Sequence, residues 1–530
     1  MSIYNYKRRN SREVEVGRII IGGNAPIAIQ SMTNTDTNDT EASVAQIKRI
    51  ADAGADLVRL TTQGVREADN MASIKARLIA DGYTLPLSAD VHFNPKAAFK
   101  AAETTDKVRI NPGNFVDAAR TFIKLDYTDE EYSAELDKIR HALHPFLQLC
   151  RANGTAVRLG VNHGSLSDRI MSRYGDTPAG MVESVMEYLR IAREIDFKDI
   201  VISIKASNTV IMTDTVKLLV KEMEKEGFDF PLHLGVTEAG DAEDGRIKSA
   251  AGIGALLALG YGDTIRVSLS EAPENEIPVA IMLRDYITSR ENHPEIAEPE
   301  KLSGNARDYS DPYDGPLPPG TRMIAYHADS PSPQSELMII DAKGALNPVG
   351  HIAATVDRYI LQGGKKTVIM SISYDSKDLD ELRIKAAADF GALLLNGYGS
   401  GIFIQDPYFS SEVLGRLELD ILQAVGLRTS KTEYISCPGC GRTLFDLQTT
   451  LQEVKHATSH LKGFKIGVMG CIVNGPGEMA DADYGYVGAG PGRVSIYKGK
   501  ECVIKNIPTS EALPRLLELI DKDHPRNSGV

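Results

Sequence analysis

Short apolar runs alternate with longer stretches of helical periodicity between about residue 26 and residue 270. The runs are rich in β-branched residues, and this alternation is typical of parallel strands joined by crossover helices. Eight such units in about 270 residues predict an N-terminal TIM-type (β/α)8 barrel, an α/β fold. The eight runs begin at Pro26, Ala55, Leu85, Asp106, Thr155, Asp199, Pro231 and Asp263.

A doubly wound open sheet is the alternative arrangement of the same units. Such sheets often carry a G-x-G-x-x-G turn after a strand, where they bind a dinucleotide. No run in this chain is followed by that turn, which favours the barrel.

The pattern changes after residue 290. Residues 292–320 are rich in Pro, Gly, Asp and Glu and predict a linker or long loop. A second α/β stretch follows, with a predicted helix near residues 378–392 and the strand-like segments RMIAYHA, LMIIDA, TVIMSIS and LLLNGYGSGIFI. We therefore expect a barrel domain over 1–290, an inserted α/β module over 291–415 and a C-terminal α+β domain over 416–530.

The C-terminal region has its own pattern. The helix-like segment SSEVLGRLELDILQAVGL leads into it from about residue 410. The segment GRVSIYKGKECVIKNI predicts a hairpin, and TSEALPRLLELIDK predicts a final amphipathic helix.

Composition limits the class of protein. The chain has 530 residues, of which 42% are hydrophobic and 25% charged, as in ordinary globular proteins. No apolar run approaches the roughly 18 residues that a membrane-spanning helix needs, and the first residues lack the apolar region of a signal peptide, so a cytoplasmic protein is expected. A net charge of −13 disfavours binding to nucleic acid, because that affinity comes largely from cations that neutralise phosphates.

Polar side chains stand at the ends of most predicted strands. In a barrel the active site lies at the C-terminal ends of the strands, so these side chains would converge on one mouth. Loops that follow strands also make strand ends polar, but this alternative does not account for five cations at similar strand positions in an acidic chain. The candidate site residues are Arg59, Asp90, His92, Arg109, Asn111, Arg158, Asn162, Ser203, Lys205, Glu238, Arg266 and Ser268.

Three of the five cysteines lie close together in the C-terminal region. Cys437 and Cys440 form a C-x-x-C pair in SCPGCGRT, and Cys471 lies in the Gly- and Pro-rich segment GCIVNGPGE. An odd number of cysteines without a secretory signal favours metal binding or free thiols over disulfides. The C-x-x-C spacing lets two thiolates reach one metal centre, and the strand FKIGVMG would bring Cys471 beside them.

The usual metal and cluster sites have four ligands, so the fourth ligand is open. Cys502 is expected to be a buried structural cysteine in a strand, and Cys150 is expected in the core of the barrel region. His456 or His460 would complete a zinc site with the three cysteines. Glu478 would reach the site if the tight turn before it folds the chain back.

Zinc and an iron–sulfur cluster are the two candidate centres. Structural zinc often has its ligands in two pairs, and here a second pair is missing. Three fixed thiolates with a weaker fourth ligand favour a cluster with one open iron, which can act as a Lewis acid on a substrate oxygen. Electron-transfer clusters usually keep four thiolates, so an open iron indicates catalysis.

Several motifs resemble the 4-hydroxy-3-methylbut-2-enyl diphosphate synthase family. In the C-terminal region they are SCPGCGRT, MGCIVNGPGE and MADADYGYVG. In the barrel region they are QSMTNTDT, VRLTTQG, ADVHF, RINPGN, RLGVNHGS, IKAS and LGVTEAG. The likeness covers nearly all of residues 20–275 and 420–500, and the stretch between them resembles the insertion in the long form of the family.

The resemblance implies a 4Fe-4S cluster that Cys437, Cys440, Cys471 and Glu478 would bind in the C-terminal domain. It also implies the reductive ring opening and dehydration of 2-C-methyl-D-erythritol 2,4-cyclodiphosphate in isoprenoid biosynthesis, with single electrons from flavodoxin or ferredoxin. The strand-end cations would hold the cyclic diphosphate, and Glu238 would help a hydroxyl leave as water.

The resemblance leaves the assembly open. In the short form of the family the cluster domain closes over the barrel of a second subunit, so a homodimer is one expectation. The inserted module would act as a spacer and could change which barrel each cluster serves.

Two other interpretations use the same residues. The cysteine turn and its α+β domain resemble the cluster domain of sulfite and nitrite reductases, but those enzymes bind sirohaem and have a fourth cysteine shortly after the third, which this chain lacks. Alternatively, a barrel stapled by zinc would be a binding or scaffold protein rather than an enzyme.

Overall fold

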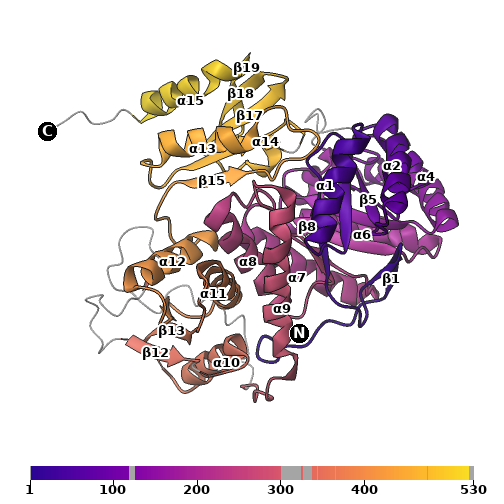
Figure 1. Cartoon of the computed structure of the whole chain (residues 1–530). Coiled ribbons are helices and arrows are strands. Elements are labelled where there is room, and N and C mark those ends of the chain that lie inside the picture. Colours follow the sequence, from indigo (N-terminus) through magenta and orange to yellow (C-terminus); the bar gives the residue numbers. More distant parts are fainter. Residues whose placement is uncertain are drawn as a thin grey trace.

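A barrel of eight parallel strands forms the first part of the computed structural model (Figure 1). The structure describes residues 2–117, 126–299, 324–325, 337–342, 344–364, 366–473 and 475–524. The barrel strands are β3 (Ala28–Met32), β4 (Leu57–Thr62), β5 (Leu87–Val91), β6 (Lys107–Ile110), β7 (Ala156–Asn162), β8 (Ile200–Lys205), β9 (His233–Leu234) and β10 (Thr264–Ile265). Neighbours follow the order β8-β7-β6-β5-β4-β3-β10-β9, and a bridge between Ile202 and Leu232 closes the barrel between β8 and β9.

All eight predicted apolar runs form these strands. The TIM-type barrel is therefore confirmed, and the alternative of an open doubly wound sheet is wrong.

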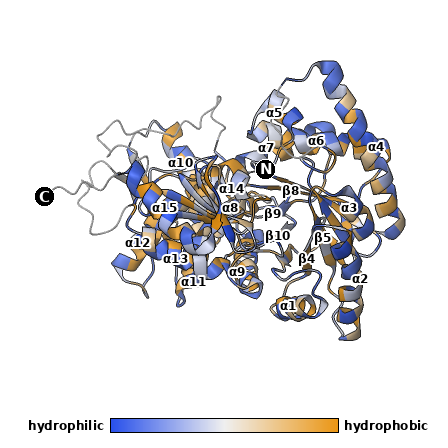
Figure 2. Cartoon of the chain, turned by 90° about the horizontal axis from the view of Figure 1, so that it is seen from above, coloured by the Kyte–Doolittle hydropathy of each residue, from blue (hydrophilic) through white to orange (hydrophobic). Residues whose placement is uncertain are grey.

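Helices surround the barrel strands. They are α1 (Thr40–Asp52), α2 (Val65–Ala80), α3 (Pro95–Ala101), α4 (Asp129–Asn153), α5 (Asp168–Tyr174), α6 (Pro178–Glu194), α7 (Thr209–Glu226), α8 (Ala242–Ala258), η1 (Pro273–Asn275), α9 (Glu276–Thr288) and η2 (Ser289–Asn292). Several begin at a side chain that accepts a hydrogen bond from a first-turn N–H, for example Asp39, Ser167 and Asn208. Hydrophilic and hydrophobic residues alternate along α2 and α4 in Figure 2, as expected when one helix face packs on the strands.

A hairpin of β1 (Val14–Val16) and β2 (Ile19–Ile21) fills the N-terminal end of the barrel. Its apolar side chains pack against Leu57, Ala156 and Val201, which start their strands or lie one residue in. Because this end is apolar and filled, the polar residues farther along the strands gather at the opposite end, where the strands finish.

The inserted module is a second, smaller α/β unit. Its four parallel strands follow the order β11 (Ile324–Ala325), β14 (Gly401–Gln405), β13 (Thr367–Ser373), β12 (Leu337–Asp341). Its helices are α10 (Pro348–Leu361), α11 (Leu379–Leu394) and α12 (Ser411–Ala424). Most of the predicted linker over 292–320, and all of RMIAYHA except Ile324–Ala325, lie outside the described residues.

The strand predicted over LLLNGYGSGIFI is wrong in its first half. Leu393 and Leu394 are the last residues of α11, and the strand begins at Gly401. Gly397 and Gly399 adopt positive φ values of 80° and 69°, so the chain turns between helix and strand.

Close contact between small residues joins the module to the barrel. A Cβ built on Gly254 of α8 would lie 2.8 Å from the Cβ of Ala388 in α11. One built on Gly391 would lie 2.6 Å from the Cα of Ala251. Larger side chains would push these two helices apart.

The C-terminal domain is a five-stranded mixed sheet in the order β15-β16-β17-β18-β19. The elements are β15 (Glu433–Ser436), α13 (Leu447–Thr458), β16 (Lys465–Met469), α14 (Gly475–Glu478), β17 (Tyr484–Gly490), β18 (Arg493–Lys498), β19 (Glu501–Pro508) and α15 (Thr509–Asp523). The predicted hairpin and final helix are β18–β19 and α15, as expected. Among the described helices, none has both the length and the apolar character that crossing a membrane requires.

The C-terminal domain lies against the barrel of its own chain (Figure 1). Ser436 forms a bridge with Ala239, which follows barrel strand β9. Lys455 in α13 pairs with Asp241 at 2.6 Å. Both barrel partners follow β9, so the cysteine region is held over the mouth.

Candidate active site

A cavity lies between the barrel mouth and the cysteine loops. Its walls combine residues from the ends of the barrel strands with residues from the C-terminal domain, more than 160 positions away in the sequence. The residues proposed from the sequence that line it are Arg59, Asp90, His92, Arg109, Arg158, Asn162, Lys205, Glu238, Arg266, Ser268, Cys437, Cys440, Cys471 and Glu478.

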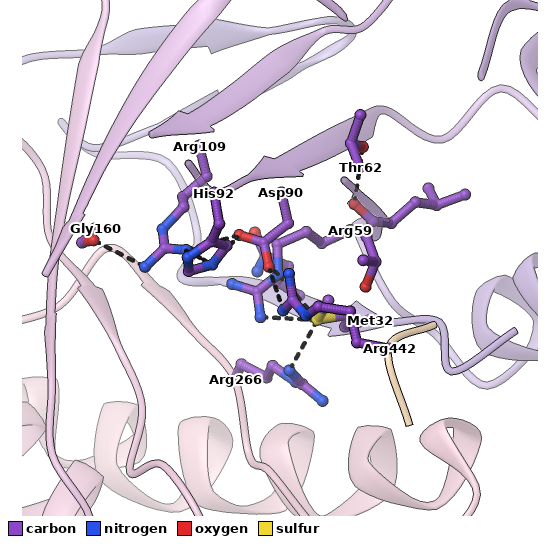
Figure 3. A network of polar contacts seen from close by, with 12 residues as sticks. Met32, Arg59, Thr62, Asp90, His92, Arg109, Gly160, Arg266 and Arg442 are labelled. Atoms are coloured by element: carbon purple, nitrogen blue, oxygen red, sulfur yellow. Dashed lines mark hydrogen bonds and ion pairs between the residues drawn. The ribbon is translucent and has the colours of Figure 1, made fainter. Parts of the chain in front are cut away.

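Asp90 in β5 is the centre of a network of cations (Figure 3). Arg109 Nη1 donates to Asp90 Oδ1 at 3.1 Å, and Arg59 Nε lies 4.0 Å from Oδ2. Arg442, from the cysteine loop, approaches Oδ2 to 3.5 Å. Burial raises the pKa of Asp90, but Arg59 and Arg109 hold it well below its usual range. One carboxylate therefore serves three guanidinium groups.

His92 lies beside this network just after the end of β5. Its ring contacts Arg109, and Nε2 is 3.7 Å from Asp90 Oδ1. Burial, and then the charge of Arg109, lowers the pKa of His92 to about 3. His92 is thus neutral near pH 7 and can donate or accept a hydrogen bond.

The sulfur of Met32 lies between two guanidinium groups (Figure 3). Arg59 Nε and Nη2 lie 3.2 and 2.9 Å from Sδ, and Arg266 Nη1 lies 3.5 Å from it. Arg266 also donates to Glu276 at 3.1 and 3.0 Å. A thioether is a weak acceptor without charge, so Met32 orients Arg59 but does not neutralise it.

Arg158 and Lys205 are buried, 2% and 4% exposed. Nε and Nη1 of Arg158 have no hydrogen-bond partner among the described residues. Burial, and then the nearby charge of Arg59, lowers the pKa of both side chains well below their usual values. Unpaired N–H groups on a buried cation are unfavourable, and an anionic ligand in the cavity would relieve this.

Two carboxyl groups meet where the C-terminal domain touches the barrel. Glu238 follows β9, and Glu478 ends the one-turn helix α14. Asn162 Nδ2 donates to Glu478 Oε1, and Ser207 Oγ donates to the Glu478 carbonyl at 3.0 Å. Burial, and then the charge of Glu478, raises the pKa of Glu238 well above its usual range. This shift favours the protonated form of Glu238.

The three thiols lie on the wall opposite the strand ends. Cys437 follows β15 and Cys471 follows β16, and these strands are parallel neighbours, so their ends are adjacent. The Gly470 N–H donates to Cys437 Sγ at 3.3 Å. Burial raises the pKa of Cys437 and Cys471, and a bound metal would deprotonate both thiols. Three thiols, a backbone N–H aimed at sulfur and a carboxylate in one cavity fit an iron–sulfur cluster.

The other candidates for a fourth ligand lie elsewhere. Cys150 is buried in α4, as expected. Cys502 is half-buried, so the prediction that it is buried is wrong; it lies on β19, the last strand of the sheet, which lacks a neighbour on one side. His456 and His460 are exposed and do not line the cavity.

Two residues proposed from the sequence do not line the cavity. Asn111 donates to Ser165 Oγ at 3.1 Å and accepts from the Gly113 N–H at 3.0 Å, so it holds the turn after β6. Ser203 Oγ is buried without a hydrogen-bond partner among the described residues, two residues before Lys205 on β8.

The cavity also contains residues that the sequence reasoning missed. Arg442 was visible in SCPGCGRT, where a cation two residues after Cys440 could have indicated a contact with the strand ends. Met32 gave no signal, because a methionine in a strand usually fills a core. The further residues on the cavity wall include Thr237 and Thr443.

Known protein families match both ends of the chain. Residues 11–281 match the family described as the GcpE TIM-barrel domain. Residues 433–522 match the family described as the GcpE protein C-terminal domain.

Relatives match over nearly the whole length. A 4-hydroxy-3-methylbut-2-en-1-yl diphosphate synthase (flavodoxin) from Phocaeicola vulgatus is 52% identical, and the match covers 98% of each chain. A chloroplastic 4-hydroxy-3-methylbut-2-en-1-yl diphosphate synthase (ferredoxin) from Oryza sativa subsp. japonica is 39% identical over 99% of this chain and 88% of its own.

Proposed function

The chain belongs to the GcpE family, and from this premise we propose that it performs the reductive ring opening and dehydration of 2-C-methyl-D-erythritol 2,4-cyclodiphosphate at the barrel mouth. The product is 4-hydroxy-3-methylbut-2-enyl diphosphate, and the chain is an oxidoreductase of isoprenoid biosynthesis. The observation that carries the site is the meeting of uncompensated barrel cations with three thiols in one cavity. The zinc-stapled scaffold is not supported, since the near full-length relatives are synthases.

The cations of the mouth bind the diphosphate. The lining has six Arg or Lys side chains against three carboxyl groups, so an anion is favoured there. Arg158 offers two unpaired N–H groups, and guanidinium forks suit phosphate oxygens. The remaining contacts come from Arg59, His92, Arg109, Asn162, Lys205, Arg266 and Ser268, and Asp90 orients the cations.

The three cysteines and Glu478 would hold a 4Fe-4S cluster. When bound, this group supplies single electrons and a Lewis-acidic iron. Glu478 suits the fourth position because a carboxylate binds iron more weakly than a thiolate does. Asn162 and Ser207 hold Glu478 at the edge of the mouth by its side chain and its carbonyl.

Glu238 supplies a proton to the hydroxyl that leaves as water. Its raised pKa favours the acid form, and its Oε2 atom has no hydrogen-bond partner among the described residues. A buried acid with a free oxygen can donate to a leaving hydroxyl without competition from water.

The partners and the assembly are further parts of this proposal. Single electrons come from flavodoxin or ferredoxin, the donors in the names of the relatives. Contacts such as Lys455 with Asp241 support a cluster that serves the barrel of its own chain. The proposed domains are residues 1–290, 291–415 and 416–530, except that helix α12 (Ser411–Ala424), which packs with the inserted module, crosses the last boundary. The protein is proposed to be cytoplasmic, with no role for nucleic acid or membranes, and a homodimer is compatible with contacts within one chain.

An anaerobic assay tests the function. Reconstituted protein with the cyclodiphosphate and a one-electron chemical reductant should form the linear allylic diphosphate. Glu478→Ala should retain iron but lose nearly all turnover, whereas Glu453→Ala, an exposed carboxylate on α13, should behave as wild type. Absence of product from wild-type protein with a full iron and sulfide content would reject the proposal. A sirohaem absorption band would instead indicate a relative of the sulfite reductases.

A further inference from the structure

Arg442 is a cation that the C-terminal domain contributes to the barrel mouth. It lies two residues after Cys440, and its side chain is 8% exposed. Besides the thiols, the charged groups that this domain contributes to the cavity wall, within the described part of the chain, are Arg442 and Glu478. Arg442 therefore brings a charge from the thiol-bearing loop to the strand-end residue Asp90 (Figure 3).

Asp90 is a weak partner for Arg442, whose side chain also hydrogen-bonds the Cys440 thiol and lies near Cys471. The distance from Arg442 Nη2 to Asp90 Oδ2 is 3.5 Å, longer than a good hydrogen bond between these groups. Arg109 already donates to the other oxygen at 3.1 Å. The Nε atom of Arg442 is buried and has no hydrogen-bond partner among the described residues.

The loop that carries Arg442 is seated directly on the rim of the barrel. A Cβ built on Gly441 would lie 2.7 Å from the carbonyl oxygen of Thr35, so the backbones touch there. The segment after Cys471 makes a similar contact with the barrel. A Cβ built on Gly164, which follows β7, would lie 2.6 Å from the carbonyl oxygen of Gly477. Any separation of the two domains would withdraw Arg442 from the mouth.

Resting on the proposed function, we propose that Arg442 is a further substrate-binding residue, which adds a cation to the diphosphate site when the C-terminal domain is closed on the barrel. In the cavity without substrate, Asp90 holds the guanidinium at the mouth. A diphosphate oxygen provides the acceptor that the unpaired N–H needs.

Calorimetric titration of the oxidised, reconstituted protein with the cyclodiphosphate tests this, since no turnover occurs without a reductant. Arg442→Gln should raise the Kd by roughly 30-fold or more, because it removes a buried charge contact. Arg442→Lys keeps the charge but loses the fork, and we expect a rise of about fivefold. In the kinetic assay with reductant, both variants should raise KM more than they lower kcat.

Lys505→Gln is the matched control. It removes a cation from the same domain, where Lys505 is exposed on β19 and does not line the cavity. Its Kd should stay within about twofold of wild type, as expected for an exposed charge far from the ligand. A Kd of Arg442→Gln within about threefold of wild type, at equal iron and sulfide content, would overturn the inference.

Other outcomes are also decisive. If Arg442→Gln fails to assemble its cluster, Arg442→Lys is compared with wild type, and an unchanged Kd and KM would reduce Arg442 to a support for the cysteine loop. A wild-type protein that neither binds nor converts the cyclodiphosphate would reject the proposed function itself. A wild type that turns over beside an Arg442→Gln variant with unchanged Kd rejects the role of Arg442 alone.

Discussion

The barrel mouth and the junction between barrel and inserted module both bury arginine beside aspartate. The two places differ in the number of cations for each carboxylate. At the junction one pair, Arg290 and Asp389, is 1% and 0% exposed. Asp389 also accepts hydrogen bonds from Tyr286 at 2.5 Å and from Tyr374 at 3.0 Å. One cation meets one anion there, and the hydroxyl groups satisfy the remaining oxygen.

At the mouth, three guanidinium groups share the carboxylate of Asp90. Arg158 and Arg290 both have Nε and Nη1 without a hydrogen-bond partner among the described residues, so the two places differ in the ratio of cations to carboxylates and not in unpaired N–H groups. A balanced buried pair holds two elements together, whereas an unbalanced set is unfavourable until an anion arrives. The same residue types therefore indicate structure in one place and binding in the other.

Removing the anion from the balanced pair should have the largest effect. Asp389→Ala leaves Arg290 charged and buried without its partner, and we expect the free energy of unfolding to fall by about 3–5 kcal/mol. Denaturant unfolding of the reconstituted protein measures this, and the KM for the cyclodiphosphate of the folded fraction should not change.

Tyr374→Phe is the matched control for that variant. It removes one hydrogen bond to Asp389 and leaves the ion pair, so about 1 kcal/mol should be lost. If Asp389→Ala were no more destabilising than Tyr374→Phe, the junction would not depend on the pair.

Removing a cation from the set at the mouth should weaken substrate binding without lowering the stability of the protein. Arg158→Gln should lower kcat/KM by about 100-fold, through KM, while the melting temperature stays equal or rises because a poorly paired buried charge is gone. Steady-state kinetics and thermal unfolding measure the two effects.

Ser203→Ala is the control for the mouth, because Ser203 lies near Arg158 on the neighbouring strand but does not line the cavity. Its KM should stay within about twofold of wild type. A destabilised Arg158→Gln variant with normal KM would mean that Arg158 supports the barrel rather than the substrate.

The smallest expected effect is a pH dependence of the free energy of unfolding, which comes from His92 beside Asp90. The folded pKa of His92 is about 3, below the ordinary value of 6.5, so the unfolded chain binds a proton more readily below pH 6.5. This group therefore contributes stability that is present above pH 6.5 and is lost as the pH falls toward 3. Between pH 6.5 and pH 5 the loss is about 2 kcal/mol.

His92→Asn lacks this titration. The stability of wild type relative to this variant should fall by about 2 kcal/mol between pH 7 and pH 5, as urea unfolding at several pH values would show. A difference that stays constant across this range would mean that the pKa of His92 in the folded protein is close to its ordinary value of 6.5.

Much of the barrel could be predicted from the sequence. Buried parallel strands require short apolar runs, and crossover helices require an apolar face, so all eight strands were visible in the pattern. Residues such as Arg59 and Lys205 were found for the same reason, because a polar residue at the end of a parallel strand faces the mouth.

The positions of some side chains could not be predicted in this way. Asn111 and Ser203 occupy the same kind of strand position as the cavity residues, but one holds a turn and the other lies deeper in the barrel. The spacing of residues in a strand predicts which way a side chain points. It does not predict how far the cavity extends along the barrel axis. In the same way, Leu393 and Leu394 suit a strand or a helix, and packing of α11 decided between them.

The sequence by itself determined the barrel, the strand-end cations and the three thiols, because these follow from local periodicity and from residue chemistry. Only the tertiary structure decided that the cysteine loops lie over the barrel of the same chain, that Glu478 reaches Asn162, and that Arg442 meets Asp90. The reason is physical: these contacts join residues more than 300 positions apart, and they depend on how rigid units pack against one another rather than on any local pattern.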